Sequence, residues 1–116
     1  MASWDDVVAM GLELPETEVG TWYGTPGIKV KGKGFVRLRD EDGLVVVMID
    51  MLEREALMQS NPKAFLITPH YEDYPAMLID LASAPNDELR ELVIESWRRK
   101  APKKLLRAYD TEHPPA

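Results

Sequence analysis

The sequence has no cysteine, no long apolar run and almost no histidine. Without cysteine among the 116 residues, disulfide scaffolds, thiolate zinc sites and cysteine nucleophiles are excluded. The longest apolar run, Leu44 to Ile49, is far shorter than the roughly 20 residues that cross a bilayer, so we predict no membrane span and no membrane partner. A metal site needs several clustered ligands, and His70 is the one histidine in the body of the chain. We therefore predict no metal and no cofactor.

The composition is that of a folded protein with one core. Apolar residues make up 45% and charged residues 29% of the chain, which is too hydrophobic for a disordered protein. The length fits one core, so we predict a single domain over residues 1–110 and a disordered tail over 111–116. Acidic residues stand near the N-terminus where a secretory signal has basic ones, and we expect a cytoplasmic protein.

Four helices are predicted from caps and from apolar residues at helical spacing, over residues 3–10, 50–59, 86–100 and 102–109. Ser3 and Asp6 form a capping box at the start of the first helix, and Gly11 is expected to end it. Asp50 is expected to cap the second helix. The inner stripe of this second helix is predicted at Leu52, Ala56 and Met58 or Gln59. The third helix carries one apolar stripe, formed by Leu89, Leu92, Val93 and Trp97.

Strict alternation of apolar and charged residues marks a β-hairpin with strands over 28–31 and 36–39. Because side chains alternate across a strand, the apolar members face a core and the charged members face the other side, together with Phe35. Further strands are predicted over 19–23, 44–49, 65–68 and 76–81, and the continuous apolar run at 44–49 is expected to be central in the sheet. The pattern predicts an α+β fold, an antiparallel sheet of about five to six strands with helices packed on it.

The segment 68–75, TPHYEDYP, concentrates polar aromatic groups at a forced turn between two strands. Its histidine is interpreted in two ways. A hydrogen-bonded imidazole can pin the turn. Alternatively, aromatic side chains and one imidazole can form a pocket for a small ligand or a peptide. The candidate pocket residues are Trp22, Tyr23, Thr25, His70, Tyr71 and Tyr74.

Two acid-free stretches carry basic clusters, although the net charge of the chain is −6. Clustered cations bind phosphates by releasing counterions, a two-stranded ribbon fits a major groove, and an exposed aromatic suits contact with bases. The candidate nucleic-acid contacts are Lys29, Lys31, Lys33, Phe35, Arg37 and Arg39 in the hairpin and Arg98, Arg99, Lys103 and Lys104 in the C-terminal helices. The alternative is that the hairpin cations are solvated side chains on the open face of a sheet. Whether the two clusters adjoin depends on the fold.

Several motifs occur together in one order: LPETEVGTWYGTPGIKV from Leu14, GKGFVRL from Gly32, DMLEREAL from Asp50, TPHYEDYP from Thr68 and ESWRRKAPKKLLRAYD from Glu95. This set resembles the MmcQ/YjbR family of small bacterial proteins, and it covers nearly the whole chain from Leu14 to Asp110. The resemblance implies a YjbR-like fold, which is often compared with a double-wing DNA-binding architecture. It supplies no catalytic motif.

Two functional hypotheses follow, and both are non-enzymatic. An enzyme is the third and least favoured alternative, because no catalytic constellation can be assembled from the sequence. The first is a binding module that contacts nucleic acid, with DNA as partner, through the basic hairpin and the C-terminal cations. The second is a domain that binds a small ligand or a protein at the pocket around His70.

Overall fold

The computed structural model describes residues 2–22, 24–39 and 43–113, without the side chain of Trp22. Within these ranges one six-stranded antiparallel sheet, in the order β1-β2-β3-β4-β6-β5, combines with four α-helices. The class is therefore α+β, as predicted. The strands are β1 (Thr17–Trp22), β2 (Thr25–Val30), β3 (Lys33–Arg39), β4 (Leu44–Met48), β5 (Phe65–Leu66) and β6 (Ala76–Asp80). The helices are α1 (Trp4–Leu12), α2 (Met51–Ser60), α3 (Asn86–Lys100) and α4 (Lys103–Glu112), and η1 (Pro69–Tyr71) is a 3₁₀ turn.

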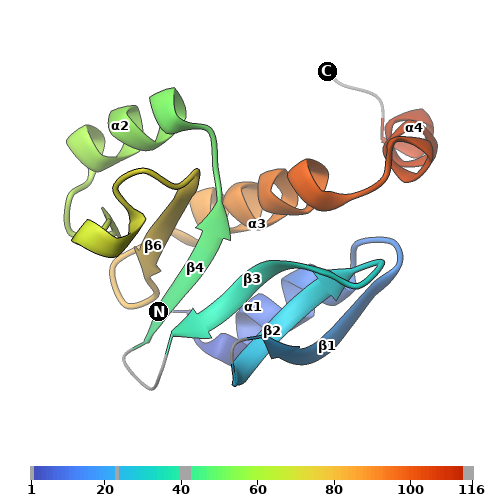
Figure 1. The fold of residues 1–116 in the computed structure, drawn as a ribbon, viewed down its shortest axis with the longest axis horizontal. Helices are drawn as coiled ribbons and strands as arrows, with labels where there is room; N and C mark the ends of the chain where they lie inside the picture. Colours follow the sequence, from blue (N-terminus) through green and yellow to red (C-terminus); the bar gives the residue numbers. More distant parts are fainter. Residues whose placement is uncertain (1, 23, 40–42, 114–116) are drawn as a thin grey trace.

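Helices α1 and α3 cover one face of the sheet and form the main core with it (Figure 1). The predicted stripe of α3 is confirmed, because Leu89, Leu92, Val93 and Trp97 are all buried. The Trp97 ring is fully buried, and its Nε1–H donates to the carbonyl oxygen of Pro15 at 3.1 Å. Strand β4 lies between β3 and β6, so its predicted central position is confirmed. Its apolar run is needed because both faces of the strand are covered near the middle.

Helix α1 begins at the predicted capping box. The backbone N–H of Ser3 donates to the Asp6 carboxylate at 2.9 Å, and the N–H of Asp6 donates back to the Ser3 hydroxyl at 3.3 Å. Gly11 does not end the helix, and this part of the prediction was wrong. It is a buried residue of α1, and a Cβ at this position would lie 2.6 Å from Cδ1 of Ile28. Gly11 therefore permits close packing of α1 on β2.

The β2–β3 hairpin turns at Lys31 and Gly32, whose φ angles of 50° and 82° are those that a tight primed turn requires. A bulge follows, because Ile28 pairs with Val36 whereas Lys29 pairs with Gly34. The extra residue, Phe35, is fully buried in the main core beside Val36. The prediction that Phe35 lies on the outer face was therefore wrong, since strict alternation fails at a bulge.

A serine of α3 completes the hydrogen bonding where β3 and β4 separate. The last paired residues are Val36 and Val47, so the carbonyl of Phe35 and the N–H of Met48 leave the ladder. The buried hydroxyl of Ser96 accepts from the Met48 N–H at 2.9 Å and donates to the Phe35 carbonyl. Because buried backbone groups need partners, this hydroxyl satisfies both strands at once.

The predicted inner stripe of α2 was right for Met58 and wrong for Leu52 and Ala56. The inner face of α2 is formed by Arg54, with Leu57 and Met58 partly buried, whereas Leu52 is 82% exposed and Ala56 is exposed. Helix α4 continues to Glu112, beyond the end at residue 109 that the sequence predicted. Residues 114–116 lie outside the described part of the chain.

Candidate ligand pocket on the second face of the sheet

The second face of the sheet is covered by a turn instead of a helix pair. One row of cross-strand neighbours runs over β3, β4, β6 and β5 on this face. It consists of Arg37, Val46, Leu78 and Leu66, in that order. Val46, Ala76 and Leu78 form a small buried cluster of their own, separate from the main core. The ring of Tyr71, from η1, packs against this cluster. The segment singled out by sequence, 68–75, therefore closes over the sheet as a lid with an apolar underside.

Arg54 of α2 holds this lid in place. Its side chain is 2% exposed, and its Nη1 donates to the carbonyl oxygens of Tyr71 and Tyr74 at 2.9 and 2.8 Å. Further contacts reach the carbonyls of Ala76 at 3.1 Å and Glu72 at 2.9 Å. The carbonyls of Tyr71 and Tyr74 also accept from the backbone N–H groups of Tyr74 and Ala76, at 3.1 and 2.7 Å. The guanidinium adds donors to this turn, where most carbonyls have no partner in the sheet. The sequence analysis missed this residue. An arginine on the inner side of a short amphipathic helix is a signal that its guanidinium binds backbone carbonyls of another segment.

The lid and the sheet enclose a pocket of about 600 Å³. Its floor is apolar, its rim is aromatic, and one cation contributes to its wall. The lining residues are Arg37, Val46, Met48, His70, Tyr71, Tyr74 and Ala76. The guanidinium of Arg37 donates from Nη2 to the Tyr71 hydroxyl at 2.7 Å. The His70 ring meets the Tyr71 ring edge-on, with centroids 5.0 Å apart, and lies 6.1 Å from the Tyr74 ring.

The structure brings together four of the six residues proposed for the aromatic pocket. His70, Tyr71 and Tyr74 line it, and Thr25 adjoins it because its hydroxyl accepts from Nη1 of Arg37 at 3.4 Å. Tyr23 and the side chain of Trp22 lie outside the described part of the structure. His70 is exposed, and among the described residues its imidazole has no hydrogen-bond partner. The alternative in which His70 pins the turn by hydrogen bonding was therefore wrong, and Arg54 performs that role.

The basic hairpin is not a free ribbon, which corrects the expectation of a two-stranded element that enters a groove. Strand β2 also pairs with β1, and β3 also pairs with β4, so both strands lie inside the sheet. Several cations have acidic or polar neighbours. Lys29 lies opposite Glu18, and Lys31 is 3.5 Å from the Glu16 carboxylate. Lys33 is exposed at the hairpin end, and Arg39 is half-buried beside Leu44 on β4.

The C-terminal cations meet the hairpin only at its turn, as far as the described residues show. Lys31 and Lys104 line one shallow depression of about 350 Å³. Arg98 instead donates to the Asp110 carboxylate at 2.7 Å. This hydrogen bond holds the pKa of Asp110 below its ordinary value and raises the pKa of Arg98. Arg99 and Lys103 are exposed.

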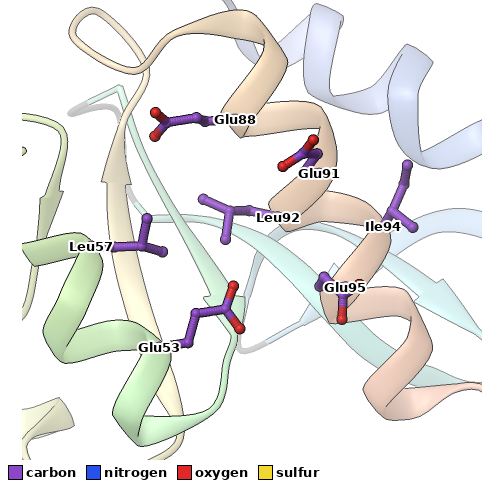
Figure 2. A pocket seen from close by; sticks show the side chains of 7 residues that line it. All are labelled: Glu53, Leu57, Glu88, Glu91, Leu92, Ile94 and Glu95. Atoms are coloured by element: carbon purple, nitrogen blue, oxygen red, sulfur yellow. The ribbon is translucent and has the colours of Figure 1, made fainter. Parts of the chain in front are cut away.

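A groove between α2 and α3 carries the opposite charge (Figure 2). It measures about 810 Å³, and Leu57 and Leu92 lie between its acidic side chains. The lining carboxylates are Glu53 from α2 and Glu88, Glu91 and Glu95 from α3. The sequence analysis missed this acidic groove, although Glu88, Glu91 and Glu95 share one helix face at spacings of three and four residues. Within the described ranges, no group of three or more histidine or carboxylate side chains is arranged to hold a metal ion.

The geometry defines an α+β domain with one apolar and aromatic pocket on the lid side of its sheet. No helix in the described part of the chain is long and apolar enough to cross a membrane. The family model YjbR matches residues 12–99, and the chain belongs to this family.

The relatives are similar over almost their whole length. The uncharacterized protein Rv2570 of Mycobacterium tuberculosis (strain H37Rv) is 32% identical, over 94% of this chain and 96% of its own. The uncharacterized protein Mb2600 of Mycobacterium bovis matches to the same extent. Among solved structures, the crystal structure of Deinococcus radiodurans protein DR2400, with family-model domain DUF419, is similar in fold. Its TM-score is 0.73 at 21% identity, over 84% of this chain and 77% of that chain.

Proposed function

We propose that this protein is a non-enzymatic binding module, and that its ligand site is the pocket under the Arg54-held lid. The observation that carries the proposal is the pocket itself. A volume of about 600 Å³, an apolar floor and a few convergent polar groups are the usual features of a site for a small organic ligand. Because the buried Arg54 ties the lid to α2 through hydrogen bonds, the pocket is formed before a ligand arrives. Preformed sites lose less entropy on binding.

The charge distribution supports this site over an extended phosphate-binding surface. Nucleic-acid affinity comes mainly from cations that neutralise phosphates. Here Lys29 faces Glu18, Lys31 pairs with Glu16 and Arg98 pairs with Asp110, while the net charge of −6 opposes a polyanion at long range.

A thermal-shift screen against small metabolites tests the pocket, because a ligand of the native state raises its stability by mass action, by about 2.7 kcal/mol at a concentration of 100 Kd. The pocket variants are His70→Ala and Tyr74→Ala, both at exposed positions, and the control is Leu52→Ala on the outer side of α2. We expect ligands that stabilise the wild type and the control but lose most of their effect on both pocket variants. Ligands that stabilise all four proteins equally would place the site elsewhere.

We propose nucleic-acid binding at the hairpin turn as a second candidate function. The observation in its favour is that Lys31 and Lys104, from the two basic clusters, line one depression, with Lys33 exposed at the same end of the hairpin. The test measures binding to a DNA duplex at two or more salt concentrations. Replacing these three lysines by glutamine is expected to reduce the slope of log affinity against log salt by about 0.9 for each phosphate contact. The matched control is Lys63→Gln, an exposed lysine after α2. No binding at low salt, or an unchanged slope, would exclude this candidate.

A further inference from the structure

The polar side chains of the pocket share one property. Each of them, Arg37, His70, Tyr71 and Tyr74, is able to donate a hydrogen bond, and no carboxylate lines the pocket among the described residues. A ligand group that accepts hydrogen bonds therefore meets donors on several sides. The charge of Arg37 makes the wall attractive to an anion, whatever other contacts the guanidinium makes.

The hydroxyl of Tyr71 defines where such an anion would lie. Its oxygen accepts from Nη2 of Arg37 at 2.7 Å, so its own proton is directed toward a different acceptor. Among the described residues no acceptor for this proton is found. The carbonyl of the same residue is held by the buried Arg54, and its ring packs on the cluster around Val46, so the hydroxyl does not turn away freely. A donor is thus held beside a cation in the lining of the pocket.

The remainder of the pocket suits a planar ring. The floor is formed by Val46, Met48 and Ala76, and the rings of His70 and Tyr74 are tilted by 30° relative to each other at the rim. A flat aromatic ligand buries its edge against the apolar floor and places its face against these rings. Thioether sulfur, as in Met48, also packs well on aromatic rings.

We infer that the ligand of this pocket is a small aromatic anion, whose acidic group accepts from Tyr71 Oη beside the Arg37 guanidinium and whose ring lies between the apolar floor and the aromatic rim. This inference rests on the proposed pocket function and specifies its ligand class. Aromatic carboxylates and nucleoside monophosphates share this chemistry.

The test uses four probes: benzoate, benzyl alcohol, cyclohexanecarboxylate and adenosine 5′-monophosphate. Binding is followed by NMR titration of the backbone and side-chain signals of the lining residues. Benzoate is expected to bind about tenfold more tightly than benzyl alcohol, because a hydrogen bond to a charged acceptor is stronger than one to a neutral group. It is also expected to bind more tightly than the non-planar carboxylate. Comparing the monophosphate with benzoate distinguishes the two sources of the anion.

Two variants assign the effect to the pocket. Tyr71→Phe keeps the ring but removes the hydroxyl, and Arg37→Gln removes the charge. Both are expected to reduce the preference for benzoate over benzyl alcohol to less than about threefold, while Tyr109→Phe, whose ring packs on Trp97 outside the pocket, leaves it unchanged. Spectra of each free variant verify that it is folded before titration.

The outcomes separate this inference from the proposed function. If benzoate and benzyl alcohol shift the same pocket signals with equal affinity, or if Tyr71→Phe and Arg37→Gln leave the preference intact, the aromatic-anion class is wrong although the pocket binds ligands. If neither the four probes nor any ligand from the metabolite screen shifts the pocket signals, the pocket function itself is wrong.

Discussion

Replacing Arg54 by methionine is expected to weaken the fold more than any exposed arginine replacement. The substitution keeps a long side chain but removes the four guanidinium hydrogen bonds to the carbonyls of Tyr71, Glu72, Tyr74 and Ala76. The carbonyls of Tyr71 and Tyr74 each keep one backbone N–H donor. At about 1 kcal/mol net for each contact, the free energy of unfolding should fall by about 4 kcal/mol. Since small domains have about 5–15 kcal/mol in total, this loss is a large fraction.

Equilibrium unfolding in urea, followed by tryptophan fluorescence, measures the change for Arg54→Met. The more conservative Arg54→Lys should fall between wild type and Arg54→Met, because an ammonium does not reach these carbonyls with a planar fork. The matched control is Arg90→Met, which breaks an exposed ion pair with Glu13 and should cost less than about 1 kcal/mol. If Arg54→Met and Arg90→Met lose the same stability, then water replaces the guanidinium and the lid does not depend on it.

Three further predictions concern the packing around the sheet. Ser96→Ala should lower the free energy of unfolding by about 2 kcal/mol, because two buried backbone groups lose their partner; an unaltered urea midpoint would contradict this. Gly11→Ala should cost about 1–3 kcal/mol, and adding Ile28→Val, which removes the clashing Cδ1, should recover part of the loss. Additive losses in the double variant would argue against the clash. The folded-state pKa of Asp110 is lowered by Arg98, so the pair stabilises α4 above the ordinary carboxyl pKa of 3.8 and loses this effect as pH falls through the folded value. Asp110→Asn should abolish that pH dependence, as monitored by NMR signals of α4.

The local elements of this fold were predictable because their signals lie within a few residues of one another. The Ser3–Asp6 capping box, the Asp50 cap and the apolar stripe of α3 appear in the structure where the sequence places them. The central position of β4 follows from its continuous apolar run. Each of these features depends on periodicity or on a cap, and neither requires knowledge of what packs against the element.

The errors occurred where a distant segment decides the outcome. One extra residue in β3 reversed the side of Phe35, because a bulge places two consecutive side chains on the same face. The inner face of α2 was misassigned since its main inward contact is polar: Arg54 reaches carbonyls 17 to 22 positions further along the chain. Hydrophobic periodicity does not predict such a contact.

The candidate site was predictable in part. The sequence by itself determined that His70, Tyr71 and Tyr74 share one turn between two strands, because they are neighbours along the chain. Only the tertiary structure placed Arg37 against the Tyr71 hydroxyl, since these two residues are 34 positions apart in the sequence. Strand order likewise paired the hairpin with β1 and β4, which turned an expected ribbon into the middle of a sheet. Sequence periodicity specifies which face of a strand is polar. The residues that a polar side chain contacts depend on strand order and on which distant segment packs against that face.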